Sequence, residues 1–320
     1  MDASSDHLQV VTLGEALVAL TPVPLGPLRT AAMFQKHLGG AELNVAVGLS
    51  RLGVRVGWAG WVGDDDFGHQ IYHLLRGEGV DVSRAVLVEG GFTGLYLRER
   101  RASGQVRVRY YRSGSAASRL AFSELDVDYL LSGDLLHLTG ITAGLSSCCH
   151  DAVARLLTEA NRRGVMVSFD VNVRSQVLAG RDAAELLLPI IEHADWLFLS
   201  DGEAELLLGG SGSDAIRQAR RRMRAETIVV HSAEGAVAVA GDEVAESPNY
   251  AVEAIDTVGA GDAFVAGYVA GRLQGLGSRE CLALAHAAGA CAVTVIGDVE
   301  AMPTLEEVAS LSAGLLGIER

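Results

Sequence analysis

Short runs of Val, Leu and Ile alternate with helical patterns along nearly the whole of this 320-residue chain. This alternation constrains the fold more than any other feature, because it predicts parallel strands joined by crossover helices. We therefore expect an α/β fold with a doubly wound, mostly parallel sheet flanked by helices. Helices are expected at residues 40–52 and 150–163, each followed by a glycine, as is typical of a helix C-terminus. The expected strands are residues 10–20, 56–62, 134–141, 165–171, 196–200 and 227–231.

The composition is that of a globular chain, because 49% of the residues are apolar and 21% are charged, which excludes a disordered or fibrous protein. The net charge of −14 opposes binding to nucleic acid or to an anionic membrane. The sequence contains no apolar run of about eighteen residues and no signal-peptide pattern, so we expect a cytoplasmic protein. Lys36 is the single lysine, and it lies outside any GxxxxGK[ST] motif, which excludes P-loop chemistry.

Cysteine and histidine show no metal-ligand spacing. The cysteines at positions 148, 149, 281 and 291 form no CxxC pair, and the nine histidines form no HExxH pattern. We therefore expect buried, unreactive thiols and no metal site built on these residue types.

One segment breaks the alternation, because residues 92–101 and 106–112 have strand character and flank the short turn 102–105. This pattern predicts an antiparallel hairpin, which does not easily join a parallel sheet. Such a hairpin serves as a lid or as a subunit contact, and the alternative is an edge hairpin without a function. Its apolar and aromatic residues, Phe92 and Tyr111 among them, favour a homodimer or higher homo-oligomer through two such lids, because a free hairpin is marginally stable.

The strongest chemical signal is the segment 256–264, DTVGAGDAF, which precedes a helix of small residues. Gly259 and Gly261 allow consecutive backbone N–H groups to converge at a helix N-terminus, where they bind an anion such as phosphate. A Rossmann interpretation is weaker, because Phe264 stands where the third glycine would be. Asp262 would repel phosphate, so it needs another task. Accepting the proton of an attacking hydroxyl is such a task, and the alternative is a simple helix cap.

At this motif the chain resembles the ribokinase-like, or pfkB, family of carbohydrate kinases, whose C-terminal signature is DTxGAGD. A second signature of the family, GGxxxN at the start of a helix, matches residues 39–44, GGAELN. Residues 62–68, VGDDDFG, lie between the two in the family's order. The resemblance covers nearly the whole chain. It implies a single kinase domain over residues 1–320, with a small β lid formed by about residues 14–38 and 92–112.

The resemblance also implies roles for the residues of the first motif. Asp262 would be the base that deprotonates the acceptor hydroxyl. The amides of residues 258–262, which include Gly259, Ala260 and Gly261, would form the anion hole for the transferred phosphoryl group.

Other matched positions point to the sugar. Gly39 and Gly40 would let the backbone approach a sugar, and Asn44 can donate to and accept from sugar hydroxyls. Ribokinases and fructokinases usually carry an acidic residue at the position held here by Ala19, which argues against both. Asp298 follows the alanine-rich helix that borders adenine in the family, and it could reach the same site.

Two further stretches resemble 2-keto-3-deoxygluconate kinases. Residues 110–117, YYRSGSAA, match their YYRxxSAA pattern, and residues 169–174, FDVNVR, match their DxNxR pattern. The arginines in these stretches, Arg112 and Arg174, have planar guanidinium groups that suit the carboxylate of a sugar acid. The alternative is that both arginines are structural residues in salt bridges.

The expected strands place these side chains near one another. Strand alternation puts Tyr110 and Arg112 on the same face of the hairpin. Tyr96 on the partner strand adds a ring face or a hydroxyl. Arg174 lies just past the C-terminal end of a parallel strand, where open α/β sheets bind ligands.

The nucleotide side departs from the family at two places, residue 200 and residues 230–232, where many relatives carry Lys-Leu-Gly and only the later Gly235 matches. Residues 200–203, SDGE, stand where the family carries the NxxE motif that organises hydrated Mg²⁺. Glu203 is kept and is implied to act on the metal, whereas Ser200 replaces the asparagine. The nucleotide contacts expected from the resemblance are Asn172, Arg174, Ser200, Ser232, Gly235, Gly259 and Gly261.

Together these observations predict an ATP-dependent kinase that phosphorylates 2-keto-3-deoxygluconate (2-dehydro-3-deoxygluconate) at its terminal hydroxyl, giving the 6-phosphate and ADP. Mg²⁺ is expected with ATP, and the sequence leaves open whether a monovalent cation is also needed. The alternative within the family is a fructokinase or another sugar kinase. The alternative outside catalysis is a sugar-acid or nucleotide binding protein, which the presence of Asp262, both glycines and Glu203 disfavours. The expected ligands are small molecules, and neither nucleic acid nor a membrane.

Overall fold

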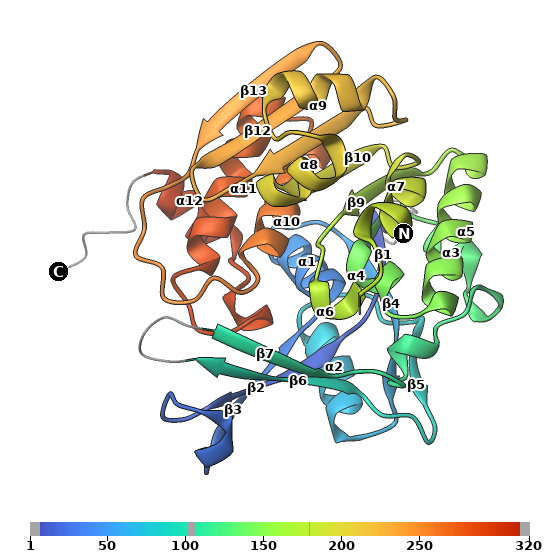
Figure 1. Ribbon diagram of the computed structural model, residues 1–320, viewed down its shortest axis with the longest axis vertical. Helices are drawn as coiled ribbons and strands as arrows, with labels where there is room; N and C mark the ends of the chain where they lie inside the picture. Colours follow the sequence, from blue (N-terminus) through green and yellow to red (C-terminus); the bar gives the residue numbers. More distant parts are fainter. Residues whose placement is uncertain (1–6, 101–105, 179, 314–320) are drawn as a thin grey trace, which may run out of the picture.

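The computed structural model describes residues 7–100, 106–178 and 180–313. In these residues the strands form a large sheet and a small sheet, and helices surround the large one (Figure 1). The strands of the large sheet are β1 (Val10–Leu13), β4 (Val56–Gly63), β5 (Ala85–Val88), β8 (Leu135–Thr139), β9 (Met166–Asp170), β10 (Trp196–Ser200), β11 (Thr227–His231), β12 (Gly235–Ala240) and β13 (Glu243–Pro248).

Helices fill most of the chain between these strands. The two helices expected from the sequence are confirmed as α1 and α5, and the glycines that follow them, Gly53 and Gly164, have the positive φ of a helix end. The helices are α1 (Ala41–Arg51), α2 (Asp66–Gly77), α3 (Val127–Leu130), α4 (Gly140–Gly144), α5 (Ser147–Arg163), α6 (Ser175–Leu178), α7 (Ala183–Ile191), α8 (Asp201–Leu208), α9 (Ser213–Arg220), α10 (Ala260–Leu273), α11 (Ser278–Ala292) and α12 (Leu305–Ser312), with 3₁₀ turns η1 (Leu28–Thr30), η2 (Ala117–Arg119), η3 (Phe122–Glu124) and η4 (Val299–Ala301).

The large sheet is mostly parallel. Within the described residues its nine strands have the order β13-β12-β11-β10-β9-β8-β1-β4-β5. Every neighbouring pair from β11 to β5 is parallel, whereas β12 is antiparallel to both β11 and β13. The expected α/β fold is therefore confirmed.

Helices cover both faces of the large sheet. One face packs on α1, α2, α10, α11 and α12, and the other packs on α3, α5, α7, α8 and α9. Neighbouring residues of a strand enter opposite cores, as Leu197 and Phe198 of β10 do, because side chains alternate along a strand. Burial on both faces explains why these strands appear in the sequence as nearly continuous apolar runs.

The small sheet contains β2 (Leu17–Pro22), β3 (Phe34–Gly39), β6 (Gly94–Arg100) and β7 (Val106–Tyr111), in the order β3-β2-β6-β7. The hairpin expected from the sequence is confirmed as the antiparallel pair β6 and β7, although its turn lies outside the described residues. This hairpin does not stand alone, because β6 also pairs in parallel with β2.

The expectation of one strand over residues 10–20 is wrong. The chain leaves the large sheet after Leu13 and enters the small sheet at Leu17, so this apolar run supplies β1 and β2. Gly14 lies at the break, and a Cβ atom there would stand 2.1 Å from Cδ of Glu42. Close contact with this buried acid therefore requires glycine where the chain changes sheets.

Three of the four cysteines are buried as expected, whereas Cys148 is only partly buried. Cys149, Cys281 and Cys291 are buried, and burial raises the pKa of Cys149 to about 12 and the pKa of the other two to about 11, so all three remain protonated thiols. None of the helices in the described part of the chain is long and apolar enough to cross a bilayer.

Candidate active site

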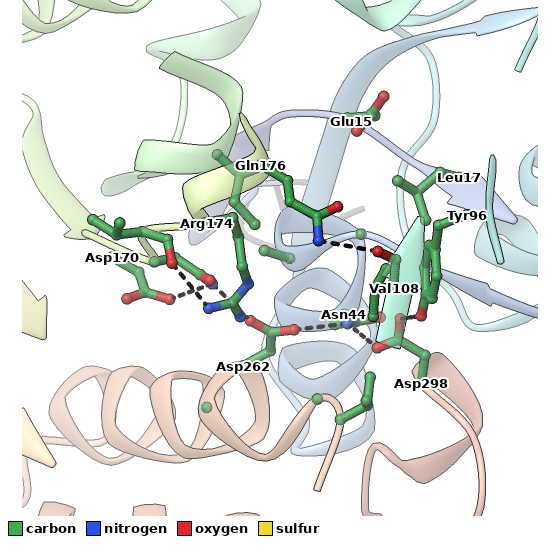
Figure 2. Close-up of a pocket in the computed structure, with 18 of the residues that line it drawn as sticks. Glu15, Leu17, Asn44, Tyr96, Val108, Asp170, Arg174, Gln176, Asp262 and Asp298 are labelled. Atoms are coloured by element: carbon green, nitrogen blue, oxygen red, sulfur yellow. Dashed lines mark hydrogen bonds between the residues drawn. The ribbon is translucent and has the colours of Figure 1, made fainter. Parts of the chain in front are cut away.

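A cavity of about 500 Å³ lies between the small sheet and the C-terminal ends of strands in the large sheet. The large sheet contributes Asp170, Ser200 and His231, each the last residue of its strand, which is where open α/β sheets bind ligands. The small sheet contributes Tyr96 and Tyr110, together with other residues of β6 and β7. The first turns of α1 and α10 complete the wall (Figure 2).

The first turn of α10 lines the cavity, and no side chain of the described residues caps it. Gly259 precedes the helix with φ of 75°, a left-handed conformation that glycine adopts without strain. The first N–H groups of an α-helix have no acceptor within the helix, so those of Ala260, Gly261 and Asp262 can bind an anion.

The amide of Val258 is already engaged. Its N–H donates to Oδ1 of Asp256 at 3.2 Å, so the amides of Gly259 to Asp262 remain for the expected anion hole. In front of Gly261 there is room, because an added Cβ atom would find its nearest neighbour, Cε1 of His231, at 3.8 Å. This turn fits a phosphoryl group both in its donors and in its space.

Asp262 lies on the same first turn, is buried and lines the cavity. Its Oδ2 accepts an N–H from Asn44 at 2.7 Å, and its Oδ1 accepts one from Asn172 at 3.3 Å. Burial raises the pKa of Asp262 to about 6, although these two hydrogen bonds limit the rise. Such a carboxylate is mostly ionised at pH 7 and is still basic enough to accept a proton from a hydroxyl.

Asn44 links two carboxylates, as Figure 2 shows. Its side-chain N–H₂ group donates to Asp262 and also to Oδ1 of Asp298, at 2.6 Å. The hydroxyl of Tyr96 donates to Oδ2 of Asp298 at 3.2 Å. Burial, and after it repulsion by Asp262, raises the pKa of Asp298 to about 7. The structure thus brings together four residues that the sequence had singled out over a span of more than 250 positions.

The two glycines before α1 allow close packing. A Cβ atom at Gly39 would stand 1.9 Å from Oδ2 of Asp298, and one at Gly40 would stand 2.2 Å from the carbonyl oxygen of Glu15. Gly40 lines the cavity, whereas Gly39 lies behind it. Gly39 therefore makes room for Asp298 and does not itself face a ligand.

The two arginines predicted to read a carboxylate differ in their surroundings. Arg112 forms a buried ion pair with Glu15, which the sequence left as the alternative, and its guanidinium lies 4.8 Å from the ring centre of Tyr110. Its Nε is buried without a hydrogen-bond partner in the described residues. Arg174 is exposed, and its Nη1 donates to the carbonyl oxygen of Val173 at 3.3 Å. Both arginines line the cavity.

Ser200 and Glu203 cap the N-terminus of α8. The Ser200 hydroxyl accepts the Glu203 N–H at 3.3 Å, and Oε2 of Glu203 accepts the Ser200 N–H at 2.8 Å. The second oxygen of Glu203 accepts the N–H of Val173. Each oxygen of Glu203 therefore accepts one backbone N–H. The described residues contain no group of three or more His, Cys, Asp or Glu side chains that could hold a metal ion.

Asn172 stands between two acids at the end of β9. Its side-chain N–H₂ group donates to Oδ2 of Asp170 at 3.0 Å and to Asp262, and its backbone has φ of 41°. Burial, followed by repulsion from Glu203 and Asp262, raises the pKa of Asp170 well above its ordinary value. Asn172 is therefore fixed by its neighbours beside the expected base.

Two of the expected nucleotide contacts lie elsewhere. Ser232 and Gly235 form the turn between β11 and β12, where the Ser232 hydroxyl donates to Oε2 of Glu234 at 2.9 Å. They line a separate hollow of about 560 Å³, together with Asp201. The structure does not bring these two residues into the cavity that contains Asp262.

Sequence reasoning missed some cavity residues. Arg98 on β6 is buried and pairs with Asp256 through both terminal nitrogens. The signal for it was strand alternation, because Arg98 follows Tyr96 by two positions and therefore faces the same way. His231 lies at the end of β11, beside the ring of Phe264.

Glu42, inside the GGAELN segment, was also missed. It is fully buried, and its Oε1 accepts hydroxyl hydrogens from Thr139 at 2.7 Å and from Thr142 at 2.6 Å. Burial raises the pKa of Glu42 to about 7. This acid joins α1 to the end of β8, behind the cavity wall.

Known proteins are similar to this chain over most of its length. A 2-dehydro-3-deoxygluconokinase of Thermoproteus tenax is 37% identical over 315 residues, which cover 96% of this chain and 95% of the relative. One from Bacillus subtilis (strain 168) is 36% identical over 309 residues, covering 95% of each chain.

A solved structure and a family model also match this chain. An Escherichia coli protein of the ribokinase type, crystallised in complex with ATP and Mg²⁺, is 27% identical with a TM-score of 0.89, over 96% of this chain and 99% of that one. The model of the pfkB family of carbohydrate kinases matches residues 7–305. A buried acid at an open helix N-terminus, the two glycine motifs and this match over nearly the whole chain lead to one conclusion: the chain belongs to the pfkB carbohydrate kinase family.

Proposed function

We propose that this protein is a 2-dehydro-3-deoxygluconokinase, which transfers the γ-phosphoryl group of ATP to the terminal hydroxyl of 2-keto-3-deoxygluconate. The observation that carries the kinase activity is the buried carboxylate of Asp262 on the uncapped first turn of α10, inside a cavity. The choice of substrate is supported by the two relatives of that name and by the arginines that line the cavity.

The proton of the acceptor hydroxyl goes to Asp262. The hydroxyl oxygen attacks the γ-phosphorus, and the bond between that phosphorus and the bridging oxygen of ADP breaks. Asn44 and Asn172 donate to the two oxygens of Asp262 and so orient the carboxylate. The first-turn amides of α10 stabilise the negative charge on the transferred group, because they are fixed donors at the positive end of a helix.

The sugar acid needs a donor for its carboxylate. Arg174 is exposed to the cavity, and Arg112 keeps a buried Nε without a hydrogen-bond partner in the described part of the chain. We assign the main carboxylate contact to Arg174, because the positive charge of Arg112 is already balanced by Glu15.

MgATP would enter from the side of Asp170, Ser200 and Glu203. Glu203, whose oxygens also accept backbone N–H groups, would help to hold the Mg²⁺ that comes with ATP. The metal, when bound, neutralises charge on the phosphates of ATP.

The small sheet supports a homodimer in which it acts as a lid and as the subunit contact. Its edge strands and adjoining loops expose large apolar side chains, which a free surface rarely carries in such number. These side chains are Met33, Phe34, Phe92, Val106 and Tyr111, each at least 41% exposed.

A coupled assay of ADP release with 2-keto-3-deoxygluconate, fructose and ribose tests the proposal, and runs with and without potassium salt measure any need for a monovalent cation. The sugar acid should have the highest kcat/KM. Arg174→Leu should lower that value by about 10- to 150-fold, the range for a charge-assisted hydrogen bond, and should lower the value for fructose much less. A faster reaction with fructose would identify a fructokinase, and binding without ADP release would identify a protein without turnover.

A further inference from the structure

A buried ion pair joins the small sheet to the loop that precedes α10. Nη1 of Arg98 on β6 donates to Oδ2 of Asp256 at 2.6 Å, and Nη2 donates to Oδ1. The side chains are 7% and 1% exposed, so the pair is shielded from water and salt. The two residues lie 158 positions apart, and their pairing is thus a property of the fold.

The same carboxylate holds the start of the anion-binding turn. Oδ1 of Asp256 also accepts the N–H of Val258, one residue before Gly259. On its other side, the N–H of Asp256 donates to the carbonyl oxygen of Val293, which follows α11. Asp256 therefore fixes the path of the backbone from α11 into the first turn of α10.

The strand that carries Arg98 also reaches the sugar side of the cavity. Tyr96, two residues earlier on β6, lines the cavity and donates to Asp298. A displacement of β6 would move Tyr96 away from Asp298 and Arg98 away from Asp256 together, because both side chains are on one face of one strand.

We propose that Arg98 is a positioning residue for phosphoryl transfer: through Asp256 it holds the amides of the first turn of α10 in place, and it does so when the small sheet lies against the cavity. This proposal rests on the proposed function in one respect, namely that the turn binds the transferred phosphoryl group. It adds that a residue of the sugar-side sheet completes the phosphate site.

The competing explanation is direct contact, because Arg98 lines the cavity and its Nε has no hydrogen-bond partner in the described residues. A double-mutant cycle separates the two explanations. If Arg98 acts through Asp256, removing one partner already removes the effect of the other, so the losses do not multiply. If Arg98 touches the phosphate itself, the losses multiply.

The measured quantity is the Kd of the protein for the Mg²⁺ complex of AMP-PNP, the imido analogue of ATP. It is determined by calorimetry without any sugar. Arg98→Gln and Asp256→Asn should each weaken binding by about 5- to 50-fold, and the double variant should match the weaker single variant within about 2-fold. Arg109→Gln on β7, an exposed arginine of the same sheet, is the control and should leave Kd unchanged. Multiplied losses, or a Kd for Arg98→Gln within about 2-fold of wild type, would overturn the proposal.

Folding is monitored by thermal unfolding of each variant. If Arg98→Gln does not fold, Arg98→Lys takes its place in the cycle, because it keeps the charge and loses the two-pronged contact. The cycle contains no sugar, so a failure of 2-keto-3-deoxygluconate as substrate would overturn the proposed function and leave this result intact. Conversely, turnover of the sugar acid with multiplied losses in the cycle would overturn the role of Arg98 alone.

Discussion

At the scale of single residues, burial makes several carboxyl groups in and around the cavity more basic. Asp262, Asp298 and Glu42 all have raised pKa values for this reason, near 6, 7 and 7 respectively. They lie within one connected region, where Asn44 bridges the first two. Raised pKa values bring carboxyl groups closer to neutral pH, which suits proton transfer.

Replacing Asp262 tests the base. Asp262→Asn should lower kcat by about 10²- to 10⁴-fold, because the amide preserves shape and cannot accept the hydroxyl proton. AMP-PNP should still bind, and thermal unfolding should show a folded protein. A variant that keeps more than about half of the wild-type kcat would make Asp262 a helix cap and not a base.

The wild-type pH profile follows from the same pKa. The base must be ionised, so kcat/KM should fall as the pH drops through about 6 and Asp262 gains a proton. Steady-state kinetics between pH 5 and 8 measure this limb, and a flat profile there would contradict the assignment.

Arg112 and Glu15 form a second test at this scale. Arg112→Leu leaves the buried Glu15 without its partner, which should cost about 3 to 5 kcal/mol of unfolding free energy at pH 8. Burial raises the pKa of Glu15, and a raised carboxyl pKa favours the folded state at low pH, so the cost should shrink toward pH 5. Denaturant unfolding at both pH values measures it. The double variant Arg112→Leu/Glu15→Leu should recover most of the loss, and an unchanged stability in the single variant would contradict the pairing.

The site residues that could be predicted from the sequence are those that lie within a short motif. Asp262, Asn44 and the glycines around them lie in segments of six and nine residues whose types suit one task. The pairs Arg98 with Asp256 and Glu15 with Arg112 could not be predicted, because their partners lie about 100 or more positions apart and no local period relates them. The sequence likewise could not show that Ser232 and Gly235 line a separate hollow, because this depends on where a turn lies in space.

At the scale of elements, the start of α10 is the critical one. Gly259→Ala should destabilise the fold by about 1 to 2 kcal/mol, because φ of 75° is unfavourable for alanine, and should raise KM for ATP, because the new Cβ lies 2.9 Å from Cε of Met302. Gly53→Ala at the end of α1 is the matched control, since φ is 84° and the Cβ has no neighbour within 4 Å among the described residues. It should lose similar stability with an unchanged KM, and equal KM values for the two variants would contradict the anion-hole assignment.

Most strands and helices could be predicted from the sequence, because strands buried on both faces of a parallel sheet are nearly continuous apolar runs. The run over residues 10–20 misled, since β1 and β2 are equally apolar and differ in which sheet they join. The break at Gly14 is set by contact with Glu42, a residue of another element.

At the scale of the whole molecule, the proposed dimer predicts a change in assembly. Phe34 and Tyr111, on the two edge strands of the small sheet, are 41% and 49% exposed. The variant Phe34→Asp/Tyr111→Asp should sediment as a monomer where the wild type sediments as a dimer, because charges oppose burial in an interface. Leu206→Asp on α8, whose leucine is 57% exposed, should not change assembly. A wild type that is monomeric at every concentration would contradict the dimer.

The pairing of Arg98 with Asp256 and of Arg112 with Glu15 also affects how substrates arrive. The positive charges of Arg98 and Arg112, which line the cavity, are each balanced by a carboxylate. The whole molecule carries a net charge of −14, and both substrates are anions. Diffusional encounter is therefore slowed by repulsion at long range. Raising the ionic strength toward 0.1 M shortens the screening length to about 10 Å, so the association rate of AMP-PNP in stopped-flow experiments should rise with salt. An enzyme whose cavity cations were unpaired would show the opposite trend.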